Sequence, residues 1–180
     1  MSDKATQLDP DLLNDFYQES KGLVADMLSS LEAIEGDFSQ VQSLEEYGQT
    51  VDRIMGGAKS LAMSVSETDF IHQVGDYAAL CKAVGYKASQ IKNNPQFFDI
   101  CVALLLDATE MLDSMLDILK SDNKKDFKQM MSQTFLDRLR WVSSQFSDEV
   151  RASVAVKPDE AKKGMDQSEI DDLLKKLGIG

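Results

Sequence analysis

Apolar residues recur every three or four positions along almost the whole chain, from residue 9 to residue 154. This spacing places them on one face of an α-helix, and no alternating pattern typical of a strand competes with it. The pattern divides into five segments. The fourth, residues 97–119, is apolar on most sides, which is typical of a central helix. The sequence therefore predicts an all-α fold, an up-and-down bundle of four to five helices over residues 9–154.

Two helix starts carry recognisable signals. Asp9 is a good N-cap and Pro10 follows it at the first helical position, while Gly36 predicts the end of this first helix. Ser43 and Glu46 have the spacing of a capping box, in which each side chain bonds the backbone N–H of the other residue. We therefore expect the first two helices to begin at these caps.

The regions outside the bundle have a different composition. Residues 1–8 are polar and lack a signal-peptide pattern, which predicts a disordered N-terminal tail. Residues 155–165 are charged, poor in apolar side chains and contain Pro158 and Gly164, as expected of a flexible linker. Residues 166–180 then form a separate C-terminal peptide.

The C-terminal peptide has the pattern of a short amphipathic helix. Its apolar positions are three, four and seven residues apart, at Ile170, Leu173, Leu174 and Leu177. A helix this short is marginal alone in water, so its apolar face needs a surface to cover it. Three alternatives follow: a latch on its own bundle, a contact with a second copy in a homodimer, or a helix that binds in a groove of another protein.

The charge balance narrows the class of partner. The net charge of −12 argues against nucleic-acid binding, which needs basic groups to neutralise phosphates, and against an anionic membrane surface. The longest apolar run, residues 101–106, is too short to span a bilayer. We expect a cytoplasmic protein whose partners carry a basic patch.

Several kinds of chemistry have no support in the sequence. Cys81 and Cys101 lie in apolar helical segments without zinc-ligand spacing, which predicts buried thiols in a reducing compartment. His72 is the only histidine. The segment GGAKS, residues 56–60, lacks the preceding strand and the Gly-Lys-Ser order of a phosphate-binding loop. We expect no metal site and no cofactor of its own.

The segment VDRIMGGAKSLA resembles the core of a histidine-phosphotransfer domain, a helical bundle. The small residues 56–58 match that motif, but Asp52 occupies the histidine position and Met55 the lysine position. The resemblance therefore implies a face that docks a receiver domain without transferring phosphate, formed by Gln49, Asp52 and Gly56.

Gly56 and Gly57 are adjacent inside the predicted second helix, and each lowers helix stability by about 1 kcal/mol relative to alanine. They indicate either close packing against a neighbouring helix or the close approach of a partner. Gly56 lies on the polar side of its helix, which favours the second interpretation.

The end of the chain, QSEIDDLLKKLGIG, resembles the C-terminal peptide of the CheZ family, the phosphatases of the chemotaxis response regulator CheY. It is also similar to the N-terminal peptide of the flagellar switch protein FliM. Peptides of both families bind CheY, so the resemblance implies a CheY-like response regulator as partner. The matching residues are Gln167, Ile170, Asp171, Asp172, Leu173, Leu174, Leu177 and Gly178.

The CheZ resemblance also implies a catalytic Asp-x-x-x-Gln pair on a helix, whose amide orients water toward the aspartyl phosphate while the receiver supplies Mg²⁺. Asp69 and Gln73 have this spacing, and Glu45 and Gln49 have an equivalent one. Either pair is also compatible with a solvated helix face. Three hypotheses remain: a receiver phosphatase, a non-catalytic adaptor or flagellar switch accessory protein, and a degenerate phosphotransfer module with an unrelated partner.

Overall fold

The computed structural model describes residues 7–122, 127–154 and 167–179, and it confirms the all-α prediction, because these residues contain helices and no strand. The elements in order are α1 (Pro10–Ile34), a 3₁₀ helix η1 (Phe38–Gln40), α2 (Ser43–Ala62), α3 (Phe70–Ala88), α4 (Pro95–Lys120), α5 (Phe127–Met130), α6 (Gln133–Val154) and α7 (Gln167–Lys176).

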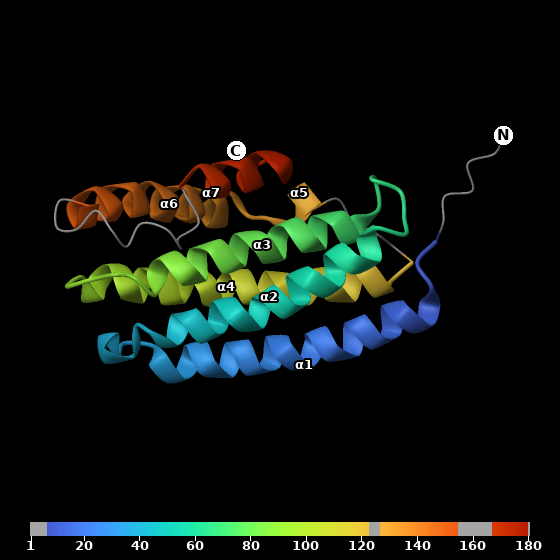
Figure 1. Ribbon diagram of the computed structural model, residues 1–180, viewed down its shortest axis with the longest axis horizontal. Helices are drawn as coiled ribbons and strands as arrows, with labels where there is room; N and C mark the ends of the chain where they lie inside the picture. The colour runs from blue at the N-terminus through green and yellow to red at the C-terminus, as the bar shows by residue number, and fades with distance from the viewer. Residues whose placement is uncertain (1–6, 123–126, 155–166, 180) are drawn as a thin grey trace.

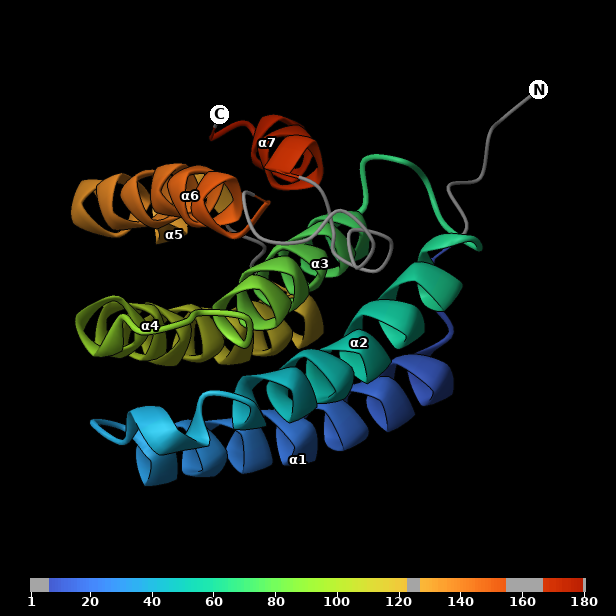
Figure 2. The ribbon, with the colours of Figure 1, turned by 60° about the vertical axis from the view of Figure 1, so that its left-hand side comes forward.

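The helices are arranged in three tiers (Figures 1 and 2). The pair α1 and α2 forms one outer tier, and the pair α3 and α4 forms the middle tier. Helix α1 packs on α2, α2 on α3, α3 on α4 and α4 on α1, so these four helices form a closed up-and-down ring. The third tier consists of α6, which packs on α4, and α7, which packs on α3 and α6. The bundle therefore has an additional helical layer over one side.

The first helix begins and ends as predicted, whereas the second does not. The Asp9 carboxylate accepts a bond from the backbone N–H of Asp11 at 2.9 Å, and Gly36, at φ +76°, follows the end of α1. The capping-box prediction is wrong, because Ser43 already lies inside α2 and no side chain caps its N-terminus. The turn that follows η1 makes such a cap unnecessary, since the carbonyls of residues 41 and 42 accept the first N–H groups of α2.

Two further expectations need correction. The predicted fifth helix is two helices, because the chain leaves helical geometry at residues 131 and 132 and the Ser132 hydroxyl accepts the N–H of Phe135 at 3.1 Å, which starts α6. The periodic apolar spacing of the first helix predicts that Leu12 is buried, but its side chain is 56 % exposed. Of the predicted N-terminal tail, residues 1–6 lie outside the described part of the chain, whereas Leu8 packs against the core.

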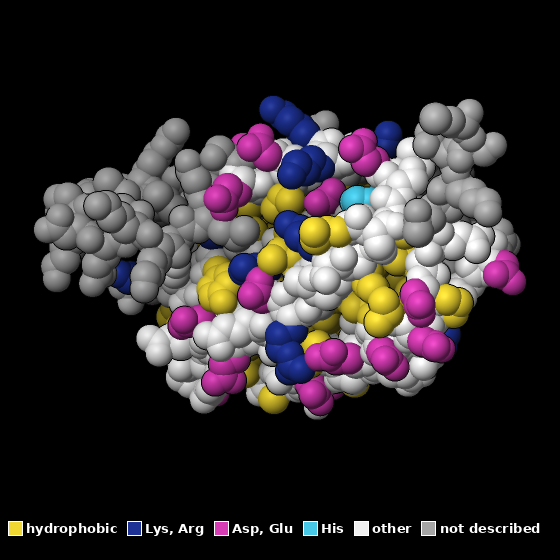
Figure 3. Space-filling model, turned by 45° about the vertical axis from the view of Figure 1, so that its right-hand side comes forward, with side chains coloured by type: hydrophobic (Ala, Val, Ile, Leu, Met, Phe, Trp, Pro, Cys, Tyr) yellow, Lys and Arg dark blue, Asp and Glu magenta, His cyan; other side chains and the backbone are white. Residues whose placement is uncertain are grey.

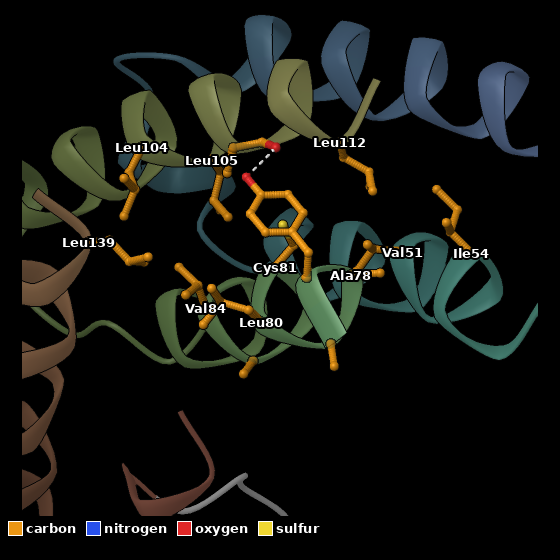
Figure 4. Packing of buried hydrophobic residues seen from close by; sticks show 14 of the residues in the cluster. Val51, Ile54, Ala78, Leu80, Cys81, Val84, Leu104, Leu105, Leu112 and Leu139 are labelled. Atoms are coloured by element: carbon orange, nitrogen blue, oxygen red, sulfur yellow. Dashed lines mark hydrogen bonds between the residues drawn. The ribbon is translucent and has the colours of Figure 1, made fainter. Parts of the chain in front are cut away.

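The core between α2, α3 and α4 contains three hydrogen-bonded hydroxyl groups, those of Tyr47, Tyr77 and Thr109. The Tyr47 and Thr109 hydroxyls lie 2.9 Å apart, and Thr109 also donates to the Leu105 carbonyl at 2.6 Å. The Tyr77 hydroxyl donates to the carbonyl of Ala108 at 2.8 Å (Figure 4). The Tyr47–Thr109 and Tyr77–Ala108 bonds join α2 and α3 to α4, so they oppose rotation of these helices relative to one another.

Both cysteines are buried and neither forms a disulfide, as predicted. Cys81 lies among apolar side chains of α3 and α4 (Figure 4), and this burial raises the pKa of its thiol to about 12. Cys81 is therefore a packing residue and stays protonated at neutral pH.

None of the helices in the described part of the chain is long and apolar enough to cross a bilayer.

We predict that Thr109→Val lowers the free energy of unfolding by about 1–3 kcal/mol, because it leaves the buried Tyr47 hydroxyl without its partner. Thr50→Val is the matched control, since the Thr50 hydroxyl bonds only the Glu46 carbonyl of its own helix at a partly exposed position. Urea denaturation of both variants checks this, and an equal effect of the two substitutions would contradict the role given to Thr109.

Candidate functional site

The C-terminal helix α7 lies against its own bundle, on α3 and α6. Its apolar face is covered: Ile170 is fully buried, and Leu173, Leu174 and Leu177 are each less than a tenth exposed. The predicted face of the helix is therefore confirmed. Of the three alternatives drawn from the sequence, the structure shows the latch. The predicted linker, residues 155–165, lies outside the described residues.

The end of α7 is fixed by a turn that the sequence signals only in part. Gly178 adopts φ +73° and its N–H bonds the Lys175 carbonyl at 2.9 Å, while the N–H of Ile179 bonds the Leu174 carbonyl at 2.9 Å. This Schellman motif turns Ile179 back toward the bundle, where it is buried. The Ile179 carbonyl accepts a bond from Arg140 of α6 at 2.8 Å. A glycine at position 178 is typical of a helix end, but nothing in the sequence indicates the contact with Arg140.

The side of α3 that faces neither α2 nor α4 includes two small buried residues. Tyr77 bonds α4 and Lys82 bonds α2, so these positions mark the two sides of α3 that face the bundle. Ala79 and Ala83 lie one turn apart on the remaining side, and both are buried, at 3 % and 0 % exposure. Because α7 is the third helix that packs on α3, we assign their cover to α7. Alanine at both positions lets the two helices approach closely.

The α2 face predicted to dock a receiver is accessible. Glu45, Gln49 and Gly56 are exposed. The Asp52 carboxylate forms an ion pair with Lys82 of α3 at 2.6 Å, so it already has a partner within the bundle. Figure 3 shows acidic side chains distributed among apolar ones on one side of the molecule, as the net charge requires.

The two adjacent glycines of α2 have different surroundings. A Cβ at Gly57 would lie 3.0 Å from the Phe16 ring of α1, so Gly57 allows close helix packing. A Cβ at Gly56 would meet nothing within 4 Å. Packing within the bundle therefore accounts for Gly57 and leaves Gly56 available to a partner.

The first predicted catalytic pair, Asp69 and Gln73, is not presented on a solvated face. Asp69 is the N-cap of α3, where its carboxylate accepts the N–H of Ile71 at 3.0 Å. Gln73 is half-buried, and its Oε1 atom, like Nε2 of His72, is buried without a hydrogen-bond partner among the described residues. The alternative pair, Glu45 and Gln49, is exposed on α2.

Across the described ranges, no three His, Cys, Asp or Glu side chains gather in a way that could hold a metal ion. Comparisons of the chain with protein-family models, with curated proteins and with solved structures gave no match.

We predict that Gly56→Ala raises the free energy of unfolding by roughly 1 kcal/mol, because alanine favours the helix and meets no neighbour. Gly85→Ala in α3 is the contrasting variant, since its Cβ would lie 2.7 Å from the Tyr47 ring, and we expect a loss of roughly 1–3 kcal/mol. Thermal or urea unfolding measures both effects, and a destabilised Gly56→Ala variant would show that position 56 is packed.

Proposed function

We propose that this chain binds a phosphorylated CheY-like receiver domain through α7 in chemotaxis signalling, and that it promotes loss of the receiver's phosphoryl group. One observation carries the binding proposal. The terminal segment is a separate helix with its own C-terminal cap, and its apolar face consists of Ile170, Leu173, Leu174 and Leu177. These four residues are among those that resemble the CheY-binding peptides of the CheZ and FliM families.

Binding by α7 would follow the helix-in-groove mode, with leucine side chains as anchors. The opposite side of α7 is acidic near its start, with Glu169, Asp171 and Asp172 exposed. A receiver surface with an apolar groove bordered by basic groups fits this helix. A tether between α7 and the bundle gives any second contact an effective concentration in about the millimolar range.

Catalysis requires an amide that can enter the active site of the receiver. In the proposed step a water oxygen attacks phosphorus in line, the bond from phosphorus to the aspartyl oxygen breaks, and inorganic phosphate and a free carboxylate result. The receiver and its Mg²⁺ carry the charge of this reaction, so the phosphatase needs only to orient the water. The exposure of Gln49 makes it the better candidate for this role than Gln73, whose amide oxygen is buried.

A receiver-binding adaptor without catalysis is the second candidate. It is favoured by the surroundings of the first predicted catalytic pair. Asp69 caps α3 and Gln73 is half-buried, so neither side chain is presented for insertion into a receiver. In that case the exposed α2 face would contribute contact alone.

We predict that replacing Leu173 and Leu174 together by alanine weakens binding to activated receiver at least tenfold, because both anchors are lost. Lys176→Ala, an exposed position on the same helix, is the control. Calorimetric titration with CheY held in its active form by beryllofluoride and Mg²⁺ measures the dissociation constant. Unchanged affinity in the double variant would contradict binding through α7.

We predict that Gln49→Ala slows phosphate release from phosphorylated CheY at least tenfold at saturating protein, whereas Gln73→Ala changes it little. Gln18→Ala on α1 removes an exposed glutamine from another helix and is the control. Release is followed with a fluorescent phosphate sensor. If binding persists and the single and double glutamine variants all release phosphate at the wild-type rate, the adaptor is correct and the glutamine mechanism is wrong.

A further inference from the structure

We infer that the surface of α3 and α6 that covers α7, here called the α7 groove, is a binding site that competes with the receiver for the same helix. This inference rests on the proposed function, because it adds regulation to the receiver-binding helix. The α7 groove is defined by Ala79 and Ala83 of α3 and by Arg140 of α6.

The competition follows from the side chains involved. All four apolar residues of the helical pattern in α7 are buried against the bundle. The face that would enter a receiver groove is therefore already occupied. A helix of ten residues has one apolar face of this kind, so α7 cannot contact both surfaces at once. Receiver binding requires α7 to leave the α7 groove first.

The bundle also lies close to the residues that follow α7. Arg140 donates to the Ile179 carbonyl at 2.8 Å, and a Cβ at Gly178 would lie 2.6 Å from Cε of Lys128 on α5. Neither Arg140 nor Ile179 belongs to the residues that resemble CheY-binding peptides. Docking of α7 can therefore be weakened from the bundle side without changing the helix that the receiver would bind.

The size of the effect depends on how often α7 is undocked. A partner that binds only the undocked form has its apparent affinity reduced by the undocked fraction. If about one molecule in ten is undocked, the apparent dissociation constant is about ten times that of a free tail. Docking in the α7 groove would thus set the receiver concentration at which the protein responds.

The test uses the full chain and two measurements, hydrogen exchange of the α7 amides and the dissociation constant for beryllofluoride-activated CheY with Mg²⁺. Ala83→Glu places a charge in the α7 groove, and Arg140→Ala removes the bond to Ile179 with little risk to folding, since its side chain is 46 % exposed. Arg138→Ala is the matched control, because Arg138 of the same helix forms an ion pair with Asp107 of α4 instead. Leu174→Glu undocks α7 by changing the helix itself.

We expect both Ala83→Glu and Arg140→Ala to lose amide protection in α7. Ala83→Glu should bind the receiver about tenfold more tightly than wild type, and Arg140→Ala a few-fold more tightly. Arg138→Ala should match wild type, and Leu174→Glu should lose protection and receiver binding together. If the groove variants lose protection but bind no more tightly, or if they keep full protection, the competition is wrong. If neither wild type nor Ala83→Glu binds the receiver, the proposed function itself is wrong.

Discussion

The burial of α3 on all its sides is the constraint on which this structure depends. Thirteen of its nineteen residues are buried, and they face in every direction around the helix. A helix that is apolar all round must be covered all round. Helices α2 and α4 cover two sides within the ring, and α7 packs on a third, to which we assign Ala79 and Ala83. The C-terminal helix is thus part of the packing of the bundle, although it lies at the end of the chain.

This dependence is mutual. A ten-residue helix has little stability alone, and burying a leucine or isoleucine side chain contributes about 1.5–3 kcal/mol. The apolar face of α7 gains this contribution on α3 and α6, and it would gain a similar one in a receiver groove. In the proposed competition, these two surfaces would form a switch whose position depends on receiver concentration. A binding helix held in this way also avoids exposing a leucine-rich face when no partner is present.

The sequence predicted the elements whose signal is periodic and missed those set by neighbours. The stripes of α2 to α4, the face of α7 and, apart from Leu12, the stripe of α1 agree with the prediction, because a 3.6-residue period reports directly which side of a helix is buried. The break between α5 and α6 was missed because the apolar spacing continues across Met131. The sequence singled out the fourth segment as central, yet α3 is equally enclosed, since alanine and glycine give little apolar signal where helices pack closely.

The candidate site shows the same division. Exposure of Gln49 and Gly56 agrees with their place on the polar side of α2. The capping role of Asp69 and the burial of the Gln73 amide oxygen depend on how the start of α3 meets the rest of the bundle, which residue spacing does not encode. The bond from Arg140 to Ile179 joins positions 39 residues apart, and a single sequence contains no sign of it.

In the proposed competition, α7 occupies the bundle when the protein is free and leaves it when a receiver binds. Pulsed electron paramagnetic resonance can follow this movement of α7 as a change in the distance between two spin labels. The labels are attached to cysteines introduced at Ser30 of α1 and Lys175 of α7, both of which are exposed. The native thiols are buried and do not compete for the label. We expect one narrow distance distribution in the free protein and a broader one at longer distances with saturating activated receiver. A distribution that stays narrow and unchanged while the receiver is bound would contradict it.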